Sequence, residues 1–161
     1  MWKRLKMRIC RQIFAADEGA LLKIWVLGTS QNDWQLVLNY FSVNYLAVYS
    51  EDGDNTPMPS AEAIFETRQD VSKTLEVMLS GFTVNCHFFE AGRIEMNILP
   101  EDVDTPEKIE AFFNLTTSIA ALLNKEVYVA PEFGGLDPER LPELAICVLD
   151  PNDQSIRSRL E

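Results

Sequence analysis

The sequence predicts an α+β fold, a single domain in which a mainly antiparallel sheet packs against two or three helices. Strand-like runs follow one another at Thr74–Leu79, Phe82–Phe89 and Arg93–Leu99, and an amphipathic helical pattern and a short apolar strand come directly after them. The 161 residues are enough to bury a core. We expect one α+β domain at residues 1–151, followed by a polar C-terminal tail at 152–161.

The first residues alternate between apolar and mostly basic side chains from Leu5 to Cys10. This alternation predicts a strand with one basic face. The basic face is either a patch for an acidic ligand or, as we prefer, an edge strand that lysine and arginine protect from aggregation.

The next part of the chain alternates between strand and helix signals. Apolar residues spaced three and four apart favour a helix, and Ser or Asn before them can cap it. The expected elements are strands at Leu21–Leu27 and Tyr45–Tyr49, a helix after Ser30 or Asn32 with Trp34, Val37, Leu38 and Phe41, an irregular loop at 51–59, and a short helix at Ala61–Glu66 capped by Ser60.

The three central runs have the two-residue period of half-buried strands, because successive side chains point to opposite faces. Gly81 separates the first two runs and predicts a bend or bulge. The short Ala91-Gly92 connection predicts an antiparallel hairpin. In the third run Arg93, Glu95 and Asn97 alternate with apolar residues, so we expect these three on the solvent-exposed face.

A long helix is predicted to begin after Thr105, which can cap its first amide groups, with Pro106 at the first helical position. We expect it to end at Asn124 and to be followed by a strand at Val127–Ala130. Leu144–Leu149 is the last expected strand, at a sheet edge. The apolar stripe that this helix must bury consists of Ile109, Phe112, Phe113, Ile119, Ala120 and Leu123.

The charge of the chain is its compositional outlier. Hydrophobic residues make up 47% and charged residues 24%, which is ordinary for a globular protein, but the formal net charge is -11. Five of the 14 basic residues precede Asp17, the first of the 25 acidic residues. Such a surface repels nucleic acid and anionic membranes and attracts basic partners, although a negative charge also simply keeps a protein soluble.

Cysteine usage indicates the compartment. Cys10, Cys86 and Cys147 are far apart and odd in number, which favours reduced, mostly buried thiols over a disulfide framework. No apolar run approaches the roughly 20 residues that span a membrane, and residues 1–12 lack the apolar segment of a secretory signal. We therefore expect a cytoplasmic protein.

Residue patterns that carry catalysis or bind metals are scarce. The single histidine, His87, follows Cys86, and neighbouring side chains in a strand point to opposite faces, so these two do not form a nucleophilic pair. The loop Asp52–Asn55 lacks the glycine and the glutamate of a calcium-binding loop. We assign no catalytic residue, no metal site and no cofactor, and we expect a non-catalytic binding protein.

The layout from Arg93–Pro100 through Val127–Glu132 resembles small acidic immunity proteins of bacterial polymorphic and contact-dependent toxin systems. The similar pattern is a strand with acidic and polar alternation, a proline, a long helix, and a short strand ending in Pro-Glu. The resemblance implies a protein that binds and neutralises a cognate toxin. The expected partner is a basic protein such as a toxin domain, which an acidic inhibitor reaches quickly by electrostatic steering.

Two acidic clusters are the expected contact surface, although the resemblance itself assigns no binding residue. Both are also explained as solvated loop charge and charge at a helix N-terminus. Two other functions stay open: a small-ligand-binding or regulatory module with a pocket between sheet and helix, and an enzyme of unrecognised type with acidic residues around a cleft. The clusters are Glu51, Asp52 and Asp54, and Glu101, Asp102 and Asp104.

Overall fold

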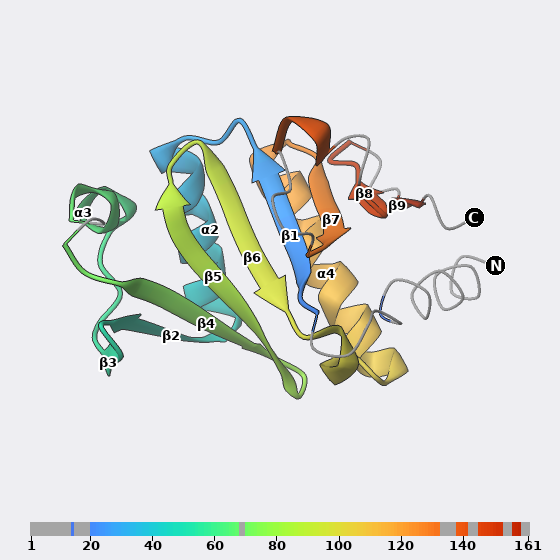
Figure 1. Ribbon diagram of the computed structural model, residues 1–161, viewed down its shortest axis with the longest axis horizontal. Helices are drawn as coiled ribbons and strands as arrows, with labels where there is room; N and C mark the ends of the chain where they lie inside the picture. Colours follow the sequence, from blue (N-terminus) through green and yellow to red (C-terminus); the bar gives the residue numbers. More distant parts are fainter. Residues whose placement is uncertain are drawn as a thin grey trace.

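The computed structural model describes residues 14, 20–67, 70–132, 138–141, 145–152 and 156–158 (Figure 1). All paired strands are antiparallel, which confirms the predicted α+β class. The strands are β1 (Leu22–Leu27), β2 (Leu46–Glu51), β3 (Asp54–Asn55), β4 (Lys73–Leu79), β5 (Phe82–Glu90), β6 (Arg93–Ile98), β7 (Val127–Pro131), β8 (Cys147–Leu149) and β9 (Ile156–Ser158). The helices are α2 (Gln31–Asn44), α3 (Ala61–Glu66), α4 (Pro106–Leu123) and the 3-10 turns η1 (Pro100–Asp102) and η2 (Pro138–Arg140).

These strands form one sheet in the order β3-β2-β4-β5-β6-β1-β7-β8-β9. Strand β1 pairs with no strand close to it in sequence. It lies between β6 and β7, with Trp25 opposite Glu95 on one side and opposite Tyr128 on the other. This insertion joins the strands that precede α4 to those that follow it.

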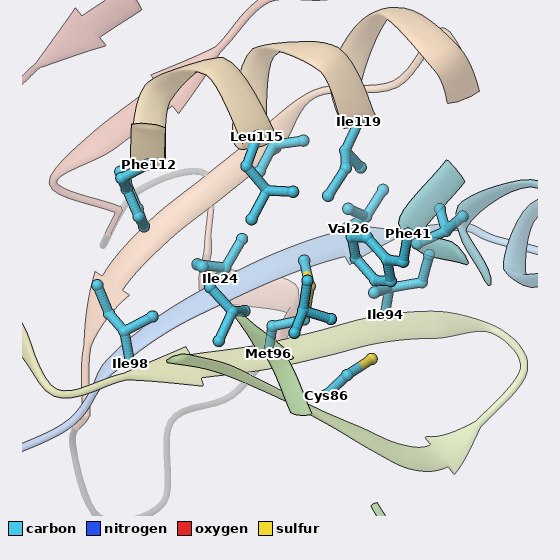
Figure 2. Packing of buried hydrophobic residues seen from close by; sticks show 14 of the residues in the cluster. Ile24, Val26, Phe41, Cys86, Ile94, Met96, Ile98, Phe112, Leu115 and Ile119 are labelled. Atoms are coloured by element: carbon cyan, nitrogen blue, oxygen red, sulfur yellow. The ribbon is translucent and has the colours of Figure 1, made fainter. Parts of the chain in front are cut away.

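Helices α2 and α4 cover one face of the sheet and lie behind it in Figure 1. We call this the helical face and the opposite side the open face. The helical face carries the apolar half of each alternating strand, and Trp34 and Phe41 of α2 are fully buried against it. Figure 2 shows Phe112, Leu115 and Ile119 of α4 above Ile24, Val26, Ile94, Met96 and Ile98 of the sheet.

The helix ends follow local sequence signals, as predicted. Ser30 Oγ accepts a hydrogen bond from Asp33 N, and Asp33 Oδ2 accepts one from Ser30 N, which forms a capping box at the start of α2. Thr105 caps α4 by accepting from Lys108 N, and Asn124 ends it in the left-handed region with a φ of 52°. No helix within the described part of the chain is long and apolar enough to cross a membrane.

Several details differ from the sequence-based expectations. Ser80 and Gly81 form a two-residue turn, tighter than the expected bend or bulge. Strand β8 is not at the edge, because β9 pairs with it, and β9 lies within 152–161, the segment predicted as a polar tail. Three residues are too few to reveal a strand by their alternation. The expected strand at Leu5–Cys10 falls outside the described residues.

Leu115 tests how α4 is packed, because it is fully buried whereas Leu122 of the same helix is 38% exposed. We expect Leu115→Ala to lower the free energy of unfolding by about 2–5 kcal/mol, since it leaves a cavity between α4 and the sheet. The control, Leu122→Ala, should cost less than about 1 kcal/mol. Urea unfolding followed by circular dichroism measures both losses, and equal losses would contradict this packing.

Candidate functional site

The first acidic cluster lies on a tight hairpin. Strands β2 and β3 pair Glu51 with Asp54, and Asp52 and Gly53 form the turn between them. Both turn residues have a positive φ, of 50° and 85°, which is the geometry of a type I′ turn, and Asp-Gly is a preferred sequence there. The segment expected to be an irregular loop therefore begins as a hairpin, and the Asp-Gly pair is the sequence signal that identifies it.

Hydrogen bonds hold the carboxylates of this hairpin in place. Asp52 N donates to Ser72 O at 2.8 Å, and Asp52 Oδ1 accepts from Ser72 N at 3.0 Å. Tyr49 Oη donates to Glu51 Oε1 at 2.8 Å. Burial, together with the hydrogen bond to Glu51, raises the pKa of Tyr49, so this phenol stays a donor.

A buried lysine places helix α3 beside the hairpin. Lys73 is 8% exposed, and its Nζ donates to Ile64 O at 2.7 Å and to Thr67 Oγ1, at the end of α3. Lys73 is also the β4 residue that pairs with Glu51, so its backbone lies beside the hairpin strand while its side chain bonds to α3. We call the exposed or half-buried carboxylates gathered here the acidic end: Glu51, Asp52, Asp54, Glu62 and Glu66.

Glu62 and Glu66 of the acidic end were not among the expected contact residues. Both are exposed, and they lie four residues apart on α3, a helix on the same side of the molecule as the hairpin in Figure 1. Their spacing places them on one side of the helix, which was the available sequence signal. Only the bonds of Lys73 to Ile64 and Thr67 show that the end of α3 lies near the strand pair that contains Glu51.

The second acidic cluster lies elsewhere. Glu101 and Asp102 are exposed on η1, which follows β6. Asp104 is also exposed and accepts from Lys108 Nζ at 2.9 Å, and this hydrogen bond and the lysine charge lower the pKa of Asp104. The Asp104 carboxylate therefore already forms an ion pair with a lysine of its own chain.

The strand register separates the two acidic clusters. The end of β6 lies beside the first half of β5 and thus near Leu79, at the end of β4. Glu51 pairs with Lys73, at the beginning of β4. The clusters therefore lie at opposite ends of the strands, and the structure does not bring the six expected residues into one contact surface.

A row of polar side chains crosses the open face of β5, β6 and β1. Lys23 Nζ donates to Glu95 Oε1 at 2.6 Å. Asn97 Nδ2 lies 2.7 Å from His87 Nε2, and Asn85 Nδ2 donates to Asn97 Oδ1 at 3.4 Å. His87 is thus hydrogen-bonded on the open face, opposite to buried Cys86. These contacts tie the three central strands together.

Glu95 and Asn97 lie on the open face, but they are not solvent-exposed as expected, since only 4% and 6% of them is accessible. The alternation placed them on the correct side of the sheet. Burial comes from their cross-strand neighbours, and Glu95 lies between Trp25 and His87. Sequence alternation cannot reveal this, because Trp25 comes from a strand far from Glu95 in the chain.

A crevice of about 410 Å³ opens where α2 passes into β2. Leu46 of β2, Met78 of β4, and Ala111 and Asn114 of α4 are among the residues that line it. It lies between the sheet and a helix, where a small-ligand-binding module is expected to have its pocket.

Cys86 and Cys147 are buried, as predicted for the thiols of this chain. Cys86 is fully buried on the helical face, and burial raises the pKa of its thiol, which disfavours the reactive thiolate. The described residues contain no group of three or more histidine, cysteine, aspartate or glutamate side chains placed to hold a metal ion.

Comparison with protein-family models, with curated proteins and with solved structures gives no match for this chain.

His87 makes the stability of the fold depend on pH. Its pKa is lowered from 6.5 chiefly by burial, with the charge of Lys23 acting in the same direction and that of Glu95 against it. The unfolded chain therefore binds this proton more readily, and stability should fall as the pH drops below about 6.5.

Proton NMR of the only histidine ring in the chain measures the pKa of His87 directly. Urea unfolding at about pH 7.5 and about pH 5.5 measures the change in stability, with His87→Gln as the variant that cannot titrate. We expect a smaller difference between the two pH values in His87→Gln than in the unsubstituted protein. A pKa of His87 above 6.5 would contradict the assignment.

Proposed function

We propose that this protein binds a basic protein partner through its acidic end and neutralises it, as an immunity protein neutralises a toxin. The observation that carries the proposal is the group of carboxylates on the β2–β3 hairpin and α3. Asp54, Glu62 and Glu66 are exposed, and none of them forms an ion pair within the described part of the chain. They can therefore pair with the cations of a partner.

The rigidity of the acidic end supports binding. Its hairpin has a two-residue turn, the backbone of Asp52 is bonded to Ser72, and Lys73 holds α3 in place. Little backbone freedom remains to be lost when a partner binds, and preorganisation of this kind raises affinity. The second acidic cluster is a weaker candidate, because Asp104 already forms an ion pair with Lys108.

The net charge of -11 supports a basic partner and a fast encounter with it. Opposite charge steers association and raises its rate, most strongly at low salt. A toxin that cleaves nucleic acid needs a basic surface to bind its substrate. An acidic protein that covers such a surface would block substrate binding, which is the neutralising step in this proposal.

Affinity capture with two matched variants tests the proposal. The acidic-end variant carries Asp54→Asn, Glu62→Gln and Glu66→Gln. The control variant carries Glu101→Gln, Asp102→Asn and Glu110→Gln, and so removes as many exposed carboxylates at the other end of the strands. From a lysate of the organism that encodes it, the tagged protein should retain one stoichiometric basic protein at low salt and release it at high salt.

The acidic-end variant should retain roughly tenfold less of this partner, whereas the control variant should retain as much as the unsubstituted protein. Co-expression then tests neutralisation, because the partner alone should arrest growth and the unsubstituted protein should restore it. Equal loss of the partner from both variants would refute the acidic end as the binding surface. Growth arrest that the protein cannot relieve would refute neutralisation.

A further inference from the structure

We infer that the outer edge of β2, from Leu46 to Val48, binds an extended segment of the basic partner as an added β-strand. This inference rests on the proposed function and names how the partner is held. The acidic end attracts the partner, and the neighbouring strand edge binds its backbone.

The outer edge of β2 is only partly covered. The terminal strand β3 pairs with Ser50 and Glu51, and one further hydrogen bond joins Thr56 N to Tyr49 O at 3.1 Å. No described residue pairs with the edge between Leu46 and Val48. In Figure 1 this edge lies at the periphery of the sheet, with only β3 beyond it.

The strand register shows which backbone groups of β2 point outward. In an antiparallel strand the N–H and C=O of one residue point to the same side, and those of the next residue point to the other side. Tyr49 accepts from Thr56 on the outer side, and Asp52 bonds to Ser72 on the β4 side. Ala47, two residues before Tyr49, therefore directs its N–H and C=O outward, where a partner strand can pair with them.

The side chains along this edge favour an apolar segment. Leu46 is 67% exposed, a fraction that only Val43 of α2 exceeds among the large hydrophobic residues of the described chain. From Leu46 to Tyr49 there is no charged residue and no proline, which are the usual means of protecting an edge strand. Leu46 also lines the crevice, which can receive a side chain of the added strand.

Charge selects the occupant of the edge. Strand β2 runs directly into Glu51 and the acidic hairpin, so a bound segment meets apolar residues at one end and carboxylates at the other. A segment with alternating apolar and basic residues matches both parts. A second copy of this chain carries such a pattern at Leu5–Cys10, but each copy has a formal net charge of -11, so two copies repel each other overall.

Ala47→Pro tests the strand addition with little effect on the sheet. Proline removes the outward N–H, whereas the groups of Leu46, Val48 and Ser50 make the bonds to β4. Ala47→Ser is the control, because it retains the N–H. Circular dichroism and urea unfolding establish that both variants fold.

The probe is a capped synthetic peptide of about eight residues that alternates valine and lysine, a length typical of strands. At low salt we expect peptide binding to slow hydrogen exchange of the Ala47 amide by about tenfold. Ala47→Pro should weaken peptide affinity about fivefold, the value of one lost hydrogen bond, and Ala47→Ser should leave it unchanged.

Three results would overturn the strand addition. They are no peptide binding at millimolar concentration, unchanged exchange of the Ala47 amide in the bound protein, and equal affinity of Ala47→Pro and Ala47→Ser. Sedimentation of the protein alone provides a further test, because a dimer that Ala47→Pro dissociates would mean that a second copy occupies the edge.

The acidic-end variant separates this inference from the proposed function. Weak peptide binding by that variant, with normal binding by Ala47→Pro, would refute strand addition and leave the acidic end as a binding surface. Normal peptide binding by the acidic-end variant would refute the role of the acidic end in attracting the basic segment.

Discussion

Burial of the helical face beneath α2 and α4 is the constraint on which the rest of the structure depends. The alternating strands place their apolar side chains on this face, and Phe41, Phe112 and Leu115 fill the space above it. The two helices do not extend over the hairpin of β2 and β3 or over the outer edge of β2 (Figure 1). Both proposed contact surfaces therefore lie where the core ends, on backbone that the core holds in position.

The elements that depend on neighbouring residues are predictable from the sequence. Thr105 and Asn124 mark the ends of α4, Ser60 marks the start of α3, and the alternation in β4, β5 and β6 identifies their inner faces. In each case the physical cause lies within a few residues of the element. The short Ala91-Gly92 connection specifies an antiparallel hairpin for the same reason.

Features that depend on distant residues are not predictable in this way. The position of β1 in the sheet, the burial of Glu95 and the separation of the two acidic clusters all follow from strand order and register. The role of Lys73 is similar, because a lysine at the start of a strand gives no sign that it will bond to the end of α3. The candidate site is therefore predictable only in part: its hairpin carboxylates were expected as contact residues, whereas Glu62 and Glu66 of the expected helix α3 were not.

The position of β1 also sets the order in which this protein can assemble. Lys23 of β1 and Glu95 of β6 are 72 residues apart in the chain, and β7 is farther still. A ribosome completes β1 long before either neighbour exists, so the nascent strand keeps both hydrogen-bonding edges and its apolar side uncovered. Unpaired strand edges and uncovered apolar surface are prone to aggregation, and contacts across such distances slow folding. Strand β1, which lies inside the finished sheet, is thus uncovered along both edges while the chain grows.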